Sequence, residues 1–165
     1  MLTFSRCQVE AKATCPGEHG PTKVGPVQPV QAIPIDDRLA IEALVTEYAW
    51  LLDHRRWDEV AGLCTDDAVL FIRGREIVGQ QGLAEWAEYR AQKKSRRTQH
   101  QMTLLRLERV EPDLVRGTAG LVLHVAKTGT SGTYVDLVGE YEDEYARTAD
   151  GWRFRRRRLI PIDAG

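Results

Sequence analysis

Four long segments in the C-terminal part of the chain constrain its fold most. They cover roughly residues 98–111, 114–127, 132–147 and 151–162, and the turn sequences EPD, KTGTSG and RTADG separate them. Their composition and length predict β-strands, and the Gly, Pro and Asp residues between them predict tight turns. Such short connections favour antiparallel hairpins, because a parallel return needs a much longer crossover.

The segments before these strands have helical spacing. Apolar residues recur at this spacing between residues 36 and 57, where Asp36 or Asp37 is the expected N-cap. The expected later elements are a short helix at 57–64, short strands at 65–72 and 75–79, and a third helix at 80–94. Helices followed by hairpins form an α+β pattern. We therefore expect a cone-shaped α+β barrel, in which a strongly bent antiparallel or mixed sheet wraps around three N-terminal helices.

The first 34 residues differ from the rest of the chain. Five of its seven prolines fall in this segment, several glycines lie among them, and no periodic pattern is present. We expect a disordered, Pro/Gly-rich arm at residues 1–34, followed by one domain at 35–165. A length of 165 residues with 42% hydrophobic content suits a single core.

Composition also argues against several classes of function. A net charge of −1 gives no general attraction to nucleic acid or to anionic lipid, and no apolar run is long enough to span a membrane. The start of the chain lacks the pattern of a secretory signal, so we expect a cytoplasmic protein. Cys7, Cys15 and His19 lack a fourth ligand and metal-site spacing, and no nucleotide-binding motif occurs. We expect no metal and no cofactor.

Several stretches together resemble a known family. They are YAWLLDHRRWDEVAGLCTDDAVLFI, VGQQGLAEW, TQH and GEYEDEYARTADGWRF. In this order they resemble the SnoaL-like branch of the nuclear transport factor 2-like superfamily, and most closely its scytalone dehydratase and lindane dehydrochlorinase type. The resemblance covers about residues 36–162. It implies a proton-transferring histidine at His100, a partner aspartate at Asp53 and, less directly aligned, a second histidine at His124.

The chemistry of such a pair supports these assignments. An imidazole both takes and returns a proton near neutral pH, and a carboxylate bound to one ring nitrogen fixes its tautomer and stabilises its charged form. If the strand alternates regularly, Thr98 and His100 face the pocket. Tyr48 is expected either to polarise a substrate oxygen or to fill the core. The expected substrate-binding walls are Trp50, Leu52, Trp86, Met102 and Tyr141.

Each candidate also has a structural interpretation. Asp53 could face solvent at a helix end, although an acid there opposes the helix dipole. His124 could instead bind a polar partner within the apolar run LVLHVA. The arginines of RFRRRRLI are expected to pair with Glu140, Glu142, Asp143 and Glu144 across neighbouring strands.

These observations predict a cofactor-independent lyase or isomerase, with dehydration as the first choice of reaction. Its substrate is expected to be small, apolar and cyclic, of a polyketide, steroid or terpenoid kind. The alternative is a non-catalytic ligand-binding or assembly module of the same fold, like the small subunit of ring-hydroxylating dioxygenases. The resemblance also implies a homodimer or a homotrimer.

Overall fold

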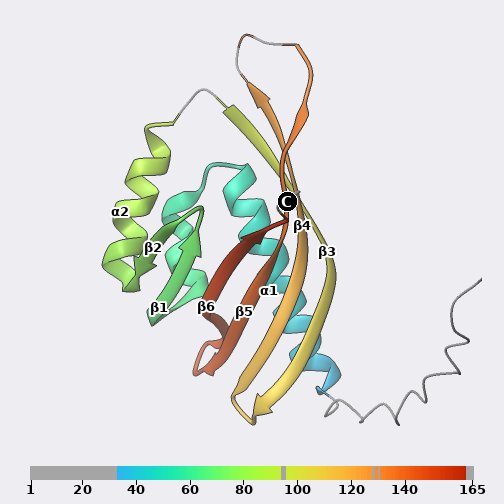
Figure 1. Ribbon diagram of the computed structural model, residues 1–165. Helices are drawn as coiled ribbons and strands as arrows, with labels where there is room; N and C mark the ends of the chain where they lie inside the picture. Colours follow the sequence, from blue (N-terminus) through green and yellow to red (C-terminus); the bar gives the residue numbers. More distant parts are fainter. Residues whose placement is uncertain (1–32, 94–95, 128, 130, 163–165) are drawn as a thin grey trace, which may run out of the picture.

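The computed structural model describes residues 33–93, 96–127, 129 and 131–162. Their elements, labelled in Figure 1, are α1 (Ile35–Asp53), the 3-10 helix η1 (Trp57–Leu63), β1 (Cys64–Ile72), β2 (Arg75–Val78), α2 (Gly79–Ala91), β3 (Arg96–Glu111), β4 (Leu114–Lys127), β5 (Tyr134–Thr148) and β6 (Gly151–Pro161). The expected arm at 1–34 lies outside the described residues, except for its last two positions. Within the part of the chain that is described, no helix has both the length and the apolar character needed to cross a membrane.

The described strands form one six-stranded sheet in the order β2-β1-β6-β5-β4-β3. The four long strands pair with one another in antiparallel fashion, as their short connections predicted. Strand β1 lies parallel to β6, so the sheet is mixed. The helix-then-hairpin order of the sequence is therefore confirmed as an α+β cone.

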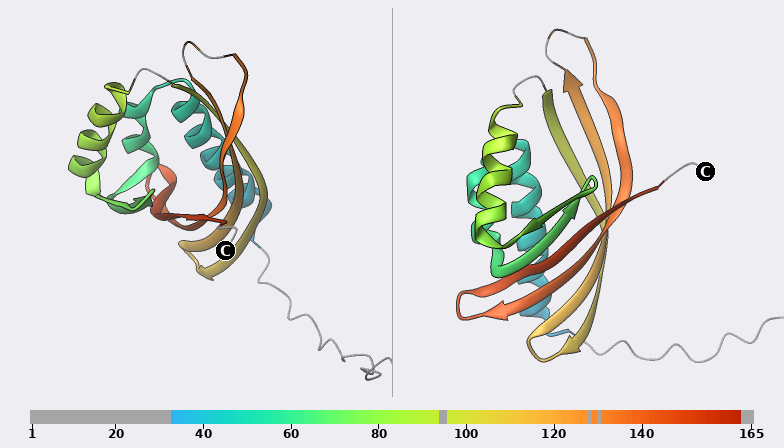
Figure 2. Two further views of the ribbon diagram at one scale, coloured as in Figure 1. Left: turned by 45° about the horizontal axis from the view of Figure 1, so that its top comes forward. Right: turned by 60° about the vertical axis from the view of Figure 1, so that its left-hand side comes forward.

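The sheet curves strongly, and the helices lie inside its curve (Figure 2). Helix α1 packs on β3 and β6, while α2 packs on β1 and η1. Strand β4 shows how the sequence produces this arrangement. Every second residue from Val115 to Val125 is buried under the helices, while the residues between them lie on the other face. The core thus fills the space between the helices and the concave face.

Helix α1 begins one residue before the expected caps. It starts at Ile35 after Pro34, and neither Asp36 nor Asp37 acts as its N-cap. Asp37 is instead buried, and its carboxylate accepts hydrogen bonds from Arg147 and from the Trp152 indole (3.2 Å). This contact ties the first turn of the helix to β5 and β6, which explains why an acidic residue occupies the position.

Candidate active site

His100 projects toward the helices from β3. Thr98 and His100 are half-buried, whereas the intervening Gln99 and Gln101 are exposed, as the alternation predicted. Across the strand pair, His100 lies opposite Leu123, whose side chain is buried in the core. Paired residues of neighbouring strands project to the same face. The imidazole therefore lies between the sheet and α1, with its side chain only 7% exposed.

Asp53 is the last residue of α1 and contacts His100 at two points. One carboxylate oxygen lies 2.6 Å from Nδ1 of the imidazole, and the other accepts the backbone N–H of His100 at 2.8 Å. A carboxylate only accepts hydrogen bonds when ionised, so Nδ1 carries the proton that it shares with Asp53. This assignment leaves Nε2 with a free lone pair, which is the arrangement that a general base requires.

The imidazole lines a small cavity of about 50 Å³. That volume accommodates roughly one or two water molecules. The lining residues are Tyr48, Leu52, Ile72, Arg73, Trp86, Arg90, Arg96, Thr98, His100, Leu121, Leu123, Tyr141 and Leu159. Five predicted residues besides His100 are among them: Tyr48, Leu52, Trp86, Thr98 and Tyr141. The lining is less apolar than expected, because three arginines contribute to it.

Tyr48 offers the cavity a hydrogen-bond donor. Its ring packs edge-on against Tyr141 and Phe154, with centroids 6.2 and 5.4 Å apart. Its hydroxyl is buried and has no hydrogen-bond partner in the described part of the chain. Burial raises the pKa of this phenol well above its ordinary value. The Tyr48 hydroxyl therefore keeps its proton and is available to an oxygen atom of a ligand.

Arg157 lies behind these tyrosines. It is fully buried, and its guanidinium pairs with Asp143 through two contacts of 2.9 Å. Its guanidinium carbon lies 4.2 and 4.0 Å from the ring centroids of Tyr48 and Tyr141. Burial opposes the charge, but Asp143 and the tyrosines outweigh it and raise the pKa of Arg157. Arg157 therefore stays charged, and its guanidinium packs against the rings of Tyr48 and Tyr141.

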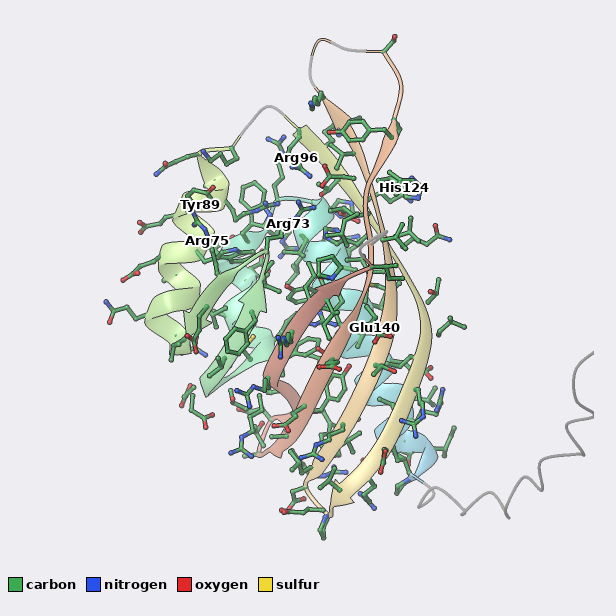
Figure 3. The ribbon with its side chains drawn as sticks, in the orientation of Figure 1. Arg73, Arg75, Tyr89, Arg96, His124 and Glu140 are labelled. Atoms are coloured by element: carbon green, nitrogen blue, oxygen red, sulfur yellow. The ribbon has the colours of Figure 1, made fainter. Side chains whose placement is uncertain are left out.

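Three predicted site residues lie away from this cavity. His124 lies opposite the exposed Gln99 and so projects from the outer face of the sheet (Figure 3). It is excluded from the site because it is one residue from the inward-facing Leu123. Trp50 is 41% exposed and stacks on His54, with ring centroids 4.2 Å apart.

Met102 has the predicted orientation but a different neighbourhood. Lying further along β3 than His100, it packs against the core and lines a separate hollow with Val45 and Thr46 of α1. The predicted wall is therefore wrong at this position, because Met102 lies at the next inward position of β3, which faces α1 at the separate hollow and not the cavity that His100 lines.

The sequence did not single out Arg73, Arg90 and Arg96 as site residues. They come from the β1–β2 turn, the last turn of α2 and the first residue of β3. Two of them carried a weaker signal. Arg90 follows Leu83, Trp86 and Ala87 on the inner side of α2, and Arg96 lies in the basic segment KKSRR, which could guide an anionic substrate. Among the described residues, no group of three or more His, Cys, Asp or Glu side chains is placed to hold a metal ion. The alternative metal ligands Cys7, Cys15 and His19 lie outside those residues.

This cavity between helices and a curved sheet defines the class of a cone-shaped α+β protein. The chain belongs to the family of SnoaL-like domains, whose model matches residues 34–158, and thereby to the nuclear transport factor 2-like superfamily. A comparison with curated protein sequences found no significant match.

Solved structures with the same fold include proteins of several kinds. A variant of Rv3472, a function-unknown protein from Mycobacterium tuberculosis, is 28% identical, with a TM-score of 0.70 and 78% of each chain covered. LinA, a lindane dehydrochlorinase, is 25% identical, with a TM-score of 0.69 over 78% of this chain and 88% of its own. A scytalone dehydratase-like protein from Novosphingobium aromaticivorans is 20% identical, with a TM-score of 0.69 over 78% and 86% of the two chains.

Proposed function

We propose that this protein is a cofactor-independent lyase or isomerase that works by general acid/base catalysis, with dehydration as its reaction. The observation that carries the proposal is the two-point contact between Asp53 and His100 beside the cavity. Because Asp53 binds both the backbone N–H and the ring of His100, it holds the imidazole in one orientation. A base fixed in this way loses little entropy when a substrate binds.

The proposed reaction begins with proton removal by His100. Nε2 takes the proton from the carbon next to a substrate carbonyl, and the carbonyl oxygen gains negative charge. The Tyr48 hydroxyl donates a hydrogen bond to this oxygen, and Asp53 stabilises the imidazolium. The electron pair then forms a carbon–carbon double bond as the β-hydroxyl leaves. His100 returns the proton to this hydroxyl, which departs as water.

The test is a panel of β-hydroxy carbonyl substrates with wild type, His100→Ala and Asp53→Asn. General-base catalysis contributes typically 10²–10⁴-fold, so we expect losses of about that size in both variants. His124→Ala is the matched control, since this histidine lies on the opposite face of the same sheet. Equal activity in wild type, His100→Ala and Asp53→Asn would overturn the proposed roles.

The size of the cavity favours a second candidate function. About 50 Å³ is too little for a whole cyclic substrate, so catalysis requires the lining side chains to move apart. A non-catalytic module of the same fold does not have this requirement. An absence of turnover across the panel, together with retained folding of the wild type, would support that alternative.

A further inference from the structure

Three arginines converge on the cavity that His100 lines. Arg73, Arg90 and Arg96 belong to different elements but share this lining. Figure 3 shows Arg73 and Arg96 in the region between the β1–β2 hairpin and β3. The Arg73 side chain is 44% exposed, so this side of the cavity is accessible from solvent. A ligand that reaches His100 from here passes several positive charges.

One carboxylate serves two of these arginines. A single oxygen of Asp136 accepts hydrogen bonds from Arg73 and, at 2.9 Å, from Arg96. Burial alone would raise the pKa of Asp136, but Arg96 and Arg73 outweigh it and lower this pKa. Asp136 is therefore ionised and contributes one negative charge. Two guanidinium groups share this charge, and Asp136 makes no ion pair with the third, Arg90.

Arg90 has no carboxylate partner among the described residues. Its Nε is buried and makes no hydrogen bond in that part of the chain, and the same is true of Nε of Arg96. The guanidinium carbon of Arg90 lies 5.4 Å from the centroid of the Trp57 ring. Burial and the nearby charges of Arg96 and Arg73 lower the pKa of Arg90. A half-buried cation in this position is unfavourable until an anion arrives.

A purely structural role explains this cluster less well. Packing on Trp57 needs only an apolar stem, which a methionine or a lysine also provides. Arg73 occupies a turn position with φ of 52°, followed by Gly74 with φ of 76°. Such hairpin turns favour Asn, Asp or Gly at both positions, so an arginine there has a backbone cost. Its side chain reaches Asp136 and the cavity from this position.

We propose that Arg90, with Arg73 and Arg96 beside it, binds a carboxylate group of the substrate. A carboxylate is planar and matches the donor fork of a guanidinium. The cavity has room for about two water molecules, which is comparable to the size of such a group. The inference rests on the proposed function, because the bound carboxylate would hold the reacting carbon near His100. It narrows the substrate to apolar molecules that carry one anionic group.

Binding of benzoate and of benzamide to the full chain, measured by calorimetry, tests this site without turnover. The two probes share size and ring but differ in charge. We expect benzoate to bind at least about tenfold more tightly than benzamide, a difference that Arg90→Gln abolishes and Arg90→Lys partly keeps. Arg75→Gln is the matched control, because Arg75 stacks on Tyr89 outside the cavity, 3.9 Å from the ring centroid (Figure 3).

The outcomes separate this site from the proposed reaction. His100→Ala should bind benzoate within about threefold of wild type, because the anion contacts Arg90 and not the imidazole. If the wild type turns over no substrate of the panel but binds benzoate in an Arg90-dependent way, the proposed reaction is wrong and the anion site stands. Equal affinity for benzoate and benzamide in wild type, or no benzoate binding, overturns the inference even if Arg90→Gln does not fold. Unchanged benzoate affinity in a folded Arg90→Gln overturns it too.

Discussion

Asp53 binds both the ring and the backbone of His100, through Oδ1 at 2.6 Å from Nδ1 and Oδ2 at 2.8 Å from the backbone nitrogen. The two residues are 47 positions apart, at the end of α1 and near the start of β3. The contact therefore joins the helical layer to the sheet at the cavity. Since the carboxylate has both oxygens occupied, its orientation and that of the imidazole depend on each other.

Replacing Asp53 tests this dependence. In Asp53→Asn the amide still accepts one hydrogen bond but no longer balances an imidazolium, so we expect near-normal stability and a change in the tautomer of His100. Asp53→Ala leaves the backbone N–H of His100 unpaired and should cost about 1–3 kcal/mol of unfolding free energy. Nitrogen-15 NMR of the histidine side chains and urea denaturation measure the two effects. An unchanged His100 spectrum in Asp53→Asn would contradict the assigned tautomer.

Replacing Tyr48 provides a test in which stability and activity are expected to change in different ways. Its buried hydroxyl lacks a partner in the described structure, so Tyr48→Phe removes a group that costs free energy to bury. We expect this variant to unfold at the same or a higher temperature than wild type, with up to about 1 kcal/mol of added stability. Turnover of the β-hydroxy carbonyl panel should fall. A clear loss of thermal stability would show that the hydroxyl has a structural partner.

The sequence predicted the fold well because its signals are local and repeated. The four long strands begin and end within two residues of their predicted bounds. Each extends over many residues, so the alternation is unambiguous and the turn residues mark the ends. Position 157 shows the limit of this reasoning. The register shifts between Glu144 and Tyr145 where β5 pairs with β6, and Phe154 and Arg157 both project inward although they are three residues apart.

The site was harder to predict because it is assembled from distant segments. The pair of Asp53 and His100 followed from a resemblance that fixes both positions. The prediction that His124 belongs to the site was wrong, because a shift of one residue along a strand turns the side chain to the opposite face of the sheet. Arg73 and Arg96 gave no periodic signal, since they lie at a turn and at a strand end. Only the three-dimensional arrangement brings them to the cavity.

The buried pair of Asp143 and Arg157 predicts a strong dependence of stability on charge balance. Arg157→Met leaves a carboxylate buried without its cation and should cost about 3–5 kcal/mol of unfolding free energy. The double variant Asp143→Asn/Arg157→Met removes both charges and should be more stable than Arg157→Met alone. Urea denaturation measures these free energies.

Arg116→Ala is the control for that pair. Arg116 pairs with Glu144 on the outer face at 3.3 Å, with its side chain 61% exposed. An exposed ion pair contributes little, so the expected cost is below about 1 kcal/mol. Strictly additive costs in the Asp143 and Arg157 variants would contradict the buried-pair interpretation.

Asp37 predicts how the fold responds to acid. Burial favours its protonated form, but hydrogen bonds from Arg147 and Trp152 outweigh burial and lower its pKa below the ordinary value of 3.8. A carboxyl group with a lowered folded-state pKa contributes stability above its unfolded-state pKa, and this contribution is lost as pH falls through the folded value. The free-energy gap between wild type and Asp37→Asn should therefore be largest near neutral pH and shrink below about pH 4.

The exposed neighbour Asp36 is the control for this pH series. Asp36→Asn should change the unfolding free energy by less than about 0.5 kcal/mol at every pH. Urea denaturation at pH 7, 5, 4 and 3 would resolve the difference. A gap between wild type and Asp37→Asn that is constant over this range would contradict a lowered pKa of Asp37 in the folded state.

Cys64 gives a prediction about reactivity. Burial raises the pKa of its thiol from 9.0 to about 12, and Sγ contacts the backbone oxygen of Val60 at 3.5 Å. The thiolate is the reactive species, so at pH 8 the folded chain should contain about a thousandfold less of it than the unfolded chain. With Cys7 and Cys15 replaced by Ser, we expect Cys64 to react with an aromatic disulfide reagent only as fast as the protein unfolds. Adding urea should restore fast labelling. Equally fast labelling with and without urea would mean that solvent reaches this thiol in the folded state.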